Sequence, residues 1–344
     1  MTQDELYMQR CIDLAKLSGK AVRSNPNVGA ILVYNESIIG EGYHRAYGSH
    51  HAEIEAIHNV KENDRKHIPD STLYVSLEPC CIERKTPACT EAIIKNKIKK
   101  VVISATDPNP DVSGKSIKLL RGKGVTVITD VLTKKGNDLI RPFRAALNKR
   151  PYVIIKFAQS SDAYFGKRGQ QVWISNEYSK KLCHKWRTEA DGILIGYQTA
   201  LTDDPQLTVR SWEGDNPARI VMDRDVSLPK NLKLFQDGNH TIVITQKIAK
   251  SENVNIDFLT PDKYDLASIL TEIYKQGIHR LIIEGGKATI NRYIEENLWD
   301  EARIITSSYA LGSGIRSPFI VGDRYDTEQV INDRIDYVYN RNCL

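Results

Sequence analysis

The chain has 344 residues, of which 41% are hydrophobic and 26% are charged. This composition excludes a disordered, collagen-like or fibrous chain, and the length favours two domains. The 48 basic and 43 acidic side chains leave a net charge of +5, which is too dilute to require a nucleic acid but suits an anionic small molecule. We expect no membrane span, because no apolar run approaches about 18 residues. The charged N-terminus predicts a packed helix rather than a signal peptide, and therefore a cytoplasmic protein.

The first 147 residues alternate between helical and strand patterns. After the N-terminal helix, two β-rich runs around Asn35-Glu36 predict a hairpin, and a helix follows from about His51. Further strands are predicted at 73–77, 101–105 and 125–128, with helices at 91–97 and 116–120. This order of elements indicates an α/β layered domain.

A polar and basic segment ending at Pro151 separates this pattern from a second one. We place the boundary so that the domains are residues 1–147 and 148–344. Strands of the second domain are predicted at 152–157, 193–196, 219–222, 241–245, 281–283 and 303–306. Helical patterns lie between several of them, so the second domain is also expected to be α/β, with a mostly parallel sheet.

Three side chains of the first domain have the character of zinc ligands. His51, Cys80 and Cys89 would supply one imidazole and two thiolates, which leaves the fourth tetrahedral position open for water, as in catalytic zinc sites. Glu53 is then the expected proton shuttle to a leaving ammonia. His51 and Glu53 point roughly 200° apart in a helix, so they can converge only at a helix end. We therefore expect the metal at a helix N-terminus, with the cysteines near the start of the next helix, just before Thr90 as its N-cap.

Each part of this pattern has a simpler explanation when taken alone. A His-Ala-Glu triplet is common by chance, but together with Pro79-Cys80 and Cys89 it matches the signature of zinc deaminases, although the cysteines lie further apart than usual. We interpret Cys81 as a bystander, because adjacent side chains rarely point to one place. The other cysteines are expected to be small buried hydrophobes or incidental surface thiols: Cys11, Cys183 and Cys343.

The loop between Cys80 and Cys89 resembles that of the deaminase half of the bifunctional deaminase-reductases of riboflavin biosynthesis. Four other segments agree with this family, at 25–29, 42–48, 51–53 and 107–110. The resemblance implies a cytidine-deaminase-like α/β/α layer fold and a diaminopyrimidinone riboside 5′-phosphate whose ring amine is hydrolysed. The substrate-binding residues that it implies are Asn25, His44, Lys85, Thr86, Asp107 and Asn109. One departure is Cys81-Ile82, where the family usually has Ser-His.

The second domain has no zinc signature and no G-x-G-x-x-G motif. Its strand at 281–283 runs into Glu284-Gly285-Gly286, a turn where backbone N–H groups can approach a phosphate, although such a sequence is more often just a tight turn. Companion segments recur in the reductase half of the same family, at 151–156, 173–175, 191–196 and 203–210, with Arg187 and Thr199. The resemblance implies a dihydrofolate-reductase-like fold that uses NADPH.

By position, the same resemblance places Lys156 and Glu284 near the sugar C1 that accepts the hydride. It implies cofactor contacts from Ala158, Trp173, Thr199, Asp203 and Gly286. It implies substrate contacts from Gln171, Arg187, Leu207, Arg210 and Glu284. Arginine suits a phosphate because it donates bidentately, although an isolated arginine is more often in a surface ion pair. The segment ending in Ala163 departs from the family, which usually has glycine there.

These patterns predict a bifunctional enzyme that deaminates a phosphorylated pyrimidine riboside with zinc and then reduces its ribosyl group to ribityl with NADPH. One alternative is a zinc deaminase that acts on nucleic acid and has a non-catalytic second domain. Its notable basic cluster would be Lys95, Lys97, Lys99 and Lys100, a pattern that is usually a solvated helix face. A second alternative is a binding protein with decayed sites. We expect neither a nucleic acid nor a membrane as partner, and a homo-oligomer is compatible with the sequence.

Overall fold

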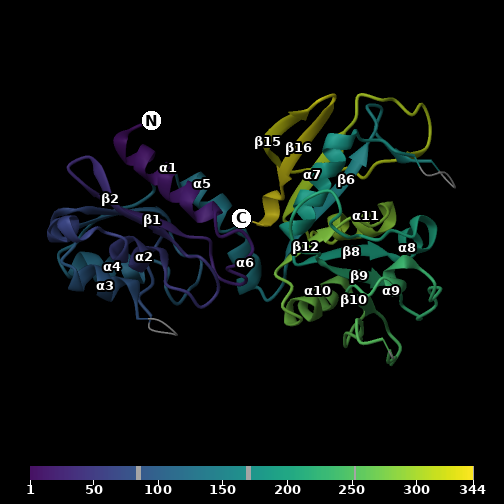
Figure 1. The fold of residues 1–344 in the computed structure, drawn as a ribbon, viewed down its shortest axis with the longest axis horizontal. Coiled ribbons are helices and arrows are strands. Elements are labelled where there is room, and N and C mark those ends of the chain that lie inside the picture. The colour runs from purple at the N-terminus through teal and green to yellow at the C-terminus, as the bar shows by residue number, and fades with distance from the viewer. Residues whose placement is uncertain (83–86, 168–171, 252, 344) are drawn as a thin grey trace. The chain divides into compact units, whose positions relative to one another are not determined.

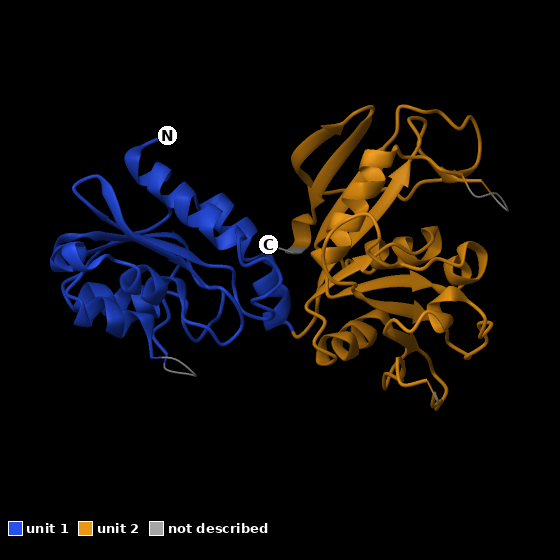
Figure 2. Cartoon of the chain, viewed as in Figure 1, with its two compact units in different colours: residues 1–148 blue, residues 149–344 orange. Residues whose placement is uncertain are grey.

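The protein folds into two compact units, which Figures 1 and 2 show in a computed structural model. The structure describes residues 1–82, 87–167, 172–251 and 253–343. Unit 1 comprises Met1–Asn148 and unit 2 comprises Lys149–Leu344. Among the described residues, none of the helices combines the length and apolar character needed to span a bilayer.

Unit 1 is built on a five-stranded sheet of order β2-β1-β3-β4-β5. Its strands are β1 (Gly29–Tyr34), β2 (Ser37–Tyr43), β3 (Thr72–Leu77), β4 (Lys100–Ala105) and β5 (Thr126–Ile128). The predicted hairpin is present, and Asn35 and Glu36 both have positive φ, as a two-residue turn that follows the strand twist requires. β3, β4 and β5 run parallel, so their carboxyl ends lie at one edge.

Helices cover both faces of this sheet. They are α1 (Gln3–Lys16), α2 (Ala52–His58), α3 (Cys89–Lys95), α4 (Lys115–Gly122), α5 (Thr133–Leu139) and α6 (Arg141–Leu147), with a 3-10 helix at Glu62–Asp70. Figure 1 shows α1 and α2 on opposite faces of the sheet. Ala30 and Leu32 pack with residues of α2, whereas Ile31 and Val33 pack with residues of α1. This alternation along β1 gives one hydrophobic core on each face of the sheet.

Close packing between β2 and α2 fixes the helix that carries the predicted metal ligand. A Cβ at Gly42 would lie 2.5 Å from the backbone nitrogen of Ala56, and one at Gly40 would lie 2.3 Å from its oxygen. Only glycine allows so close an approach of backbone to backbone. The N-terminus of α2 is thereby held at the edge where β3 and β4 end.

Unit 2 contains a nine-stranded sheet of order β11-β10-β9-β8-β12-β6-β13-β16-β15. The predicted strands are present as β6 (Tyr152–Gln159), β8 (Gly192–Gly196), β9 (Ala218–Met222), β10 (Thr241–Ile244), β12 (Arg280–Ile283) and β13 (Glu301–Thr306). The strands without a sequence prediction are β7 (Tyr164–Gly166), β11 (Ile256–Leu259), β14 (Ile315–Arg316), β15 (Asp323–Val330) and β16 (Asp333–Tyr339). The sheet is parallel from β11 to β13 and antiparallel at β16 and β15, so the expectation of a mostly parallel sheet is confirmed.

Two neighbouring parallel strands of unit 2 each lead directly into a helix. The helices of this unit are α7 (Glu177–Thr188), α8 (Tyr197–Asp203), α9 (Lys233–Gln236), α10 (Leu266–Lys275) and α11 (Lys287–Glu295). Gly196 precedes α8 and Gly286 precedes α11. A Cβ at Gly285 would lie 2.8 Å from the nitrogen of Gly196, so the two turns pack against each other through glycine. Ligands of open α/β sheets bind at this carboxyl edge.

Candidate active sites

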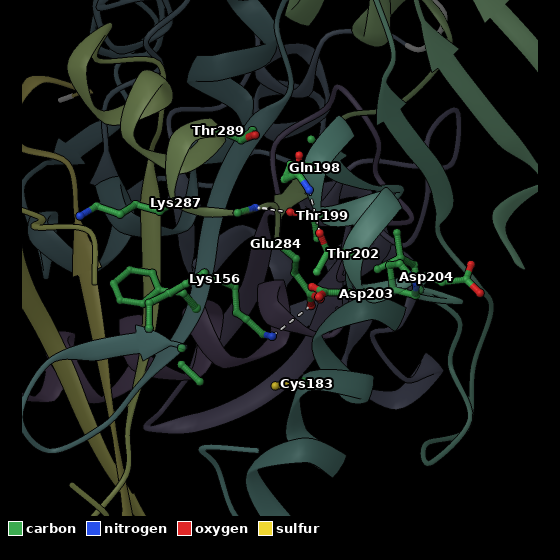
Figure 3. Close-up of a pocket in the computed structure, with 18 of the residues that line it drawn as sticks. Lys156, Cys183, Gln198, Thr199, Thr202, Asp203, Asp204, Glu284, Lys287 and Thr289 are labelled. Carbon is green, nitrogen blue, oxygen red and sulfur yellow. Dashed lines mark hydrogen bonds and ion pairs between the residues drawn. The ribbon is translucent and has the colours of Figure 1, made fainter. Parts of the chain in front are cut away.

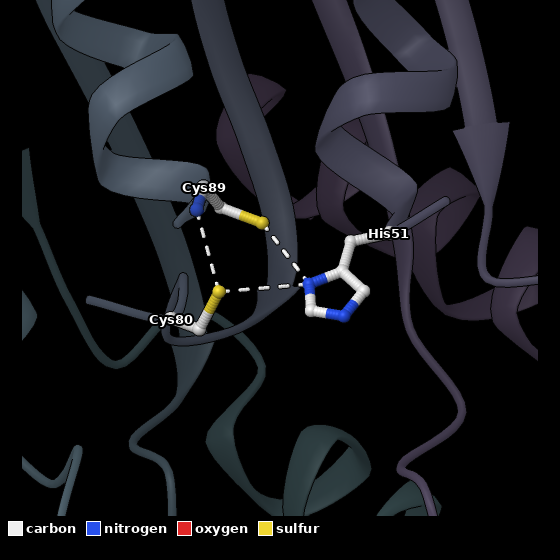
Figure 4. Close-up of side chains that lie close together, drawn as sticks. All are labelled: His51, Cys80 and Cys89. Carbon is white, nitrogen blue, oxygen red and sulfur yellow. Dashed lines mark hydrogen bonds between the residues drawn. The ribbon is translucent and has the colours of Figure 1, made fainter. Parts of the chain in front are cut away.

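The three predicted zinc ligands converge in unit 1 (Figure 4). His51 is the N-cap of α2, Cys89 is the first residue of α3, and Cys80 lies in the segment that follows β3. The Nδ1 atom of His51 is 3.2 Å from the Sγ of Cys89 and 3.5 Å from the Sγ of Cys80. The three donor atoms all lie within 4.8 Å of one another. One imidazole and two thiols at such distances fit a zinc ion with an open fourth position.

Hydrogen bonds at this cluster stabilise one thiolate. The Cys89 thiol, His51 and the backbone N–H of Cys89, which is 3.3 Å from the Cys80 Sγ, together lower the pKa of Cys80 to about 4. The hydrogen bond with Cys80 correspondingly raises the pKa of Cys89. The first amide of a helix and its dipole favour a negative sulfur. The hydrogen bonds of the folded chain therefore favour the deprotonated form of Cys80 that zinc binding requires.

The prediction that Thr90 caps α3 is wrong. The N-cap is Ala88, and Thr90 is the second residue of the helix, where its Oγ1 is buried without a hydrogen-bond partner in the described chain. The physical reason lies in Cys80, whose Sγ accepts the N–H of Cys89 and whose carbonyl accepts the N–H of Thr90 at 3.1 Å. Cys80 thus satisfies the first two amides of the helix, and a capping side chain is not needed.

Glu53 lies in the first turn of α2, where the predicted convergence at a helix end is observed. Its side chain is 3% exposed and lines a cavity of about 380 Å³ that also contains His51 and Cys80. Burial raises the pKa of Glu53. A buried carboxyl group beside the metal ligands can hold a proton and release it to a leaving group.

The same cavity contains the described residues that were predicted to bind the substrate. They are Asn25, His44, Asp107 and Asn109. Lys85 and Thr86 lie outside the described residues. Ile82, at the position where the family usually has histidine, lines the cavity with an apolar side chain. Cys81 does not belong to the group of ligand atoms found in the described chain.

Hydrogen bonds fix the tautomer of His44. Its Nδ1 is 3.0 Å from the carbonyl oxygen of His50, which can only accept, so Nδ1 carries the proton. Its Nε2 then accepts from the Asn25 amide at 3.1 Å. Burial lowers the pKa of His44, which keeps the ring neutral. Asn25 is therefore oriented with its amide nitrogen toward His44.

A buried ion cluster lines the site in unit 2, and Figure 3 shows one of its pairs, Lys156 with Glu284. The Lys156 ammonium is 3.3 Å from the Glu284 Oε1, and the Arg187 Nη2 is 3.1 Å from its Oε2. Burial would raise the pKa of Glu284, but the charges of Arg187 and Lys156 outweigh it and lower this pKa to about 2. Although burial opposes the charge of Lys156, its partners raise the pKa of this lysine. Both carboxylate oxygens of Glu284 are thus engaged by cations.

The predicted phosphate ligands of unit 2 are placed differently from each other. Arg187 is partly buried, and besides Glu284 it donates to the Thr208 carbonyl at 2.9 Å. Arg210 donates to the side chains of Gln206 and Thr208 at 2.8 and 3.3 Å. Both arginines, with Leu207, line a cavity of about 1510 Å³. Gln171 lies outside the described residues.

The predicted cofactor residues line this same large cavity. They are Ala158, Trp173, Thr199, Asp203 and Gly286. The backbone N–H of Gly286 donates to the Thr199 Oγ1 at 2.7 Å, which ties the start of α11 to α8 (Figure 3). A Cβ at Gly286 would lie 2.9 Å from that oxygen. A glycine turn at a helix N-terminus, inside a cavity of this size, fits the phosphates of a dinucleotide.

Cys183 and His184 are two of the residues of this cavity that sequence reasoning missed. Cys183 is buried beside Lys156 (Figure 3) and lines the cavity, whereas we expected a small buried hydrophobe or an incidental surface thiol with no place in a site. His184 lines it as well, and its Nδ1 accepts the backbone N–H of Arg210 at 3.2 Å. The signal that could have found Cys183 is its spacing of four residues from Arg187, which puts both side chains on one face of α7.

Comparison with known proteins agrees with this geometry. Residues 1–105 match the model of the cytidine and deoxycytidylate deaminase zinc-binding region, and residues 151–330 match that of the RibD C-terminal domain. The riboflavin biosynthesis protein RibD of Aquifex aeolicus is 34% identical over 320 residues, which cover 91% of this chain and 89% of that protein. The chain belongs to the RibD family.

Other RibD proteins agree over nearly the whole chain. RibD of Escherichia coli is 30% identical over an alignment that covers 91% of this chain and 90% of the Escherichia coli protein. Among solved structures, the deaminase/reductase of Thermotoga maritima superposes with a TM-score of 0.85 at 31% identity, covering 98% of this chain and 99% of its own. RibD of Acinetobacter baumannii superposes with a TM-score of 0.83 at 29% identity, covering 98% of each chain.

Membership of the RibD family confirms the main predictions. The fold is a cytidine-deaminase-like unit followed by a dihydrofolate-reductase-like unit, and the protein is a bifunctional deaminase and reductase of riboflavin biosynthesis. Its cofactors are zinc and NADPH. The alternative of a nucleic acid deaminase with a non-catalytic second domain is not supported, because the second half also matches RibD. The roles of individual site residues stay predictions.

Proposed function

We propose that unit 1 hydrolyses the ring amine of a diaminopyrimidinone riboside 5′-phosphate. The convergence of His51, Cys80 and Cys89 beside the buried Glu53 supports this reaction. His51, Cys80 and Cys89 would hold the zinc ion, which when bound would supply a Lewis acid that activates water. Glu53 takes a proton from that water and gives it to the departing amine, so that ammonia leaves and an oxo group replaces it. Asn25, Asp107 and Asn109 hold the substrate in the cavity.

Unit 2, in this proposal, reduces the ribosyl group of the deaminated product to ribityl. The Lys156–Glu284–Arg187 cluster supports it, since an ammonium group is held at the cavity by a carboxylate that keeps its charge. NADPH, when bound, supplies the hydride. As hydride adds at the sugar C1 and the bond from C1 to the ring oxygen opens, Lys156 gives a proton to that oxygen. Glu284 positions Lys156, because both of its oxygens are already paired.

The proposal also includes a cytosolic location. Metal binding requires deprotonated and reduced thiols at Cys80 and Cys89, and reducing compartments keep thiols in that state. The phosphate groups of the small-molecule substrates would be bound by a few placed side chains, namely Lys85, Thr86, Arg187 and Arg210. A net charge of +5 is therefore sufficient for binding the anionic substrate.

A direct assay tests both reactions. The purified zinc-loaded protein is incubated with the diaminopyrimidinone phosphate, with and without NADPH, while ammonia and NADPH absorbance are followed. We expect ammonia in both mixtures and NADPH oxidation only where deaminated product forms. No ammonia would refute the deaminase assignment, and no oxidation of NADPH on the deaminated product would refute the reductase assignment.

A further inference from the structure

Glu78 is a buried carboxylate at the deaminase site to which the mechanism above gives no role. It is 2% exposed and lines the same cavity as Glu53. No described basic side chain pairs with it. Instead its carboxylate accepts three backbone N–H groups, from Asp107 at 3.2 Å, Gly114 at 3.0 Å and Ile117 at 3.4 Å. Burial of a carboxylate is costly without partners, so these amides are the groups that allow Glu78 to be here.

The three amides belong to the loop after β4 and to the start of α4. The N-cap of α4 is Gly114, which has a φ of 72° and no side chain that could accept from the first turn. The Glu78 carboxylate acts as the capping group instead, because it accepts hydrogen bonds from the backbone N–H groups of Gly114 and Ile117. The backbone of Glu78 also donates to the carbonyl of Ala105, the last residue of β4, at 2.8 Å. One residue therefore anchors both ends of the loop.

Further hydrogen bonds continue from Glu78 through the loop into the cavity. Asp107, held by Glu78, accepts the N–H of Asn109 on its Oδ1 at 2.8 Å. Asn109 in turn accepts the N–H of Asp111 on its own Oδ1 at 3.1 Å. The side-chain oxygen of Asn109 is thus engaged, while its side-chain nitrogen makes no hydrogen bond within the described chain. Since Asn109 lines the cavity, this nitrogen can donate to a ligand there.

We propose that Glu78 is a positioning residue of the deaminase, which sets Asp107 and Asn109 against the substrate by holding the loop that carries them. This inference rests on the proposed deaminase function. The metal ligands do not depend on this anchor, since Cys80 is held by the amides of Cys89 and Thr90 and since His51 starts a different helix. Loss of the anchor should therefore weaken substrate binding while zinc stays in place.

The test is Glu78→Gln, which keeps the size of the side chain but turns an N–H donor toward the backbone amides. We expect the KM of deamination for the diaminopyrimidinone phosphate to rise about tenfold or more, as the loss of charge-assisted hydrogen bonds to a buried group implies. The kcat should change much less, and zinc content and reductase activity should stay at the wild-type level. Glu36→Gln, on the exposed hairpin turn, is the matched control.

A double variant separates positioning from general damage. Asn109→Ala alone should raise the KM without loss of zinc, and adding Glu78→Gln should then raise it by a smaller factor than in the wild type, because the Asn109 contact is already lost. The positioning role would be overturned by any one of three results. These are KM increases that multiply fully in the double variant, an unchanged KM in either single variant, and loss of zinc from Glu78→Gln. Absence of deamination by the wild-type protein would instead refute the deaminase function on which the role rests.

Discussion

The two sites of this protein hold their charged groups by different means. In the deaminase unit, main-chain amides help to hold negative groups: Cys80 accepts the amide of Cys89 in addition to its contacts with the Cys89 thiol and His51, and Glu78 accepts three amides. In the reductase unit, charged side chains hold one another, with Glu284 between Lys156 and Arg187. Main-chain amides remain after a side chain is replaced, whereas a removed ion-pair partner leaves the other charge buried without compensation.

This difference predicts different responses to mutation. Replacement of a side chain at the zinc site should abolish the role of that side chain in deamination and leave the neighbouring residues in their positions. A change in the ion cluster should alter the protonation of its neighbours, and therefore the pH dependence of the reaction. Each unit also provides a control for the other, because the two activities can be measured on the same preparation.

The largest effect is expected from Cys89→Ser. Removal of one of three protein ligands should greatly weaken zinc binding and reduce deamination to background, while NADPH oxidation on the deaminated product persists. Metal analysis and ammonia release check this outcome. Cys81→Ser is the matched control and should keep both zinc and activity, since Cys81 is outside the group of ligand atoms. Stoichiometric zinc in Cys89→Ser would contradict the assigned ligand set.

Glu53→Gln should be next in size. The amide cannot shuttle a proton, so we expect kcat of deamination to fall by about 10²–10⁴-fold, with zinc retained. Steady-state kinetics and metal analysis on the same sample measure the two quantities. Glu55→Gln, which alters the pairs of Glu55 with Arg45 and His50 outside the cavity, should leave kcat unchanged. An active Glu53→Gln protein would show that another group moves the proton.

The deaminase site could be read from the sequence largely because its ligands are local. His51 and Glu53 are two residues apart, and Cys80 and Cys89 flank one loop, so a few spacings fix the chemistry. The cap of α3 could not be read in this way. Its amides are satisfied by Cys80, nine residues before Cys89, and a local capping rule therefore pointed to Thr90.

The reductase site was accessible only through the family resemblance. Arg187 and Glu284 are 97 residues apart, and no local pattern indicates that they pair. The hairpin of β15 and β16 was missed for another reason. Most of β15 is exposed at the edge of the sheet and is polar, so it lacks the alternation of apolar residues that indicates a half-buried strand.

A smaller and more diagnostic effect is expected from Arg187→Gln. Arg187 is the leading charge that lowers the pKa of Glu284 to about 2, against burial, which raises it. In the wild type, the stabilisation from this carboxylate is present above the unfolded-state pKa near 4.5 and is lost only as pH falls through about 2. Without Arg187 the folded pKa should rise, so loss of stability and of reductase activity should begin at a higher pH.

The pH profile of the reductase distinguishes two roles of Arg187. If Arg187 keeps Glu284 charged, the variant should gain an acid limb between about pH 4 and 6 that the wild type lacks. If it only binds the substrate phosphate, KM should rise with no new limb. A flat profile in the variant would therefore contradict the importance of the ion cluster for protonation. Deamination by the same samples controls for acid damage to the whole protein.

The smallest effect should follow from Thr199→Val. Its hydroxyl oxygen accepts the N–H of Gly286 at 2.7 Å. The donor is a main-chain amide, as in the deaminase site, but the acceptor is neutral, so this is neither an ion pair nor a charge-assisted hydrogen bond. Since a typical hydrogen bond contributes about 1 kcal/mol, the KM for NADPH should rise roughly fivefold, with kcat and its pH dependence unchanged. Thr271→Val, whose hydroxyl donates only within α10, is the matched control. If Thr199→Val instead gained a new acid limb in the pH profile of reduction, the turn at Gly286 and the ion cluster of Glu284 would be coupled. The main-chain contact and the ion pairs of the reductase site would then not act independently.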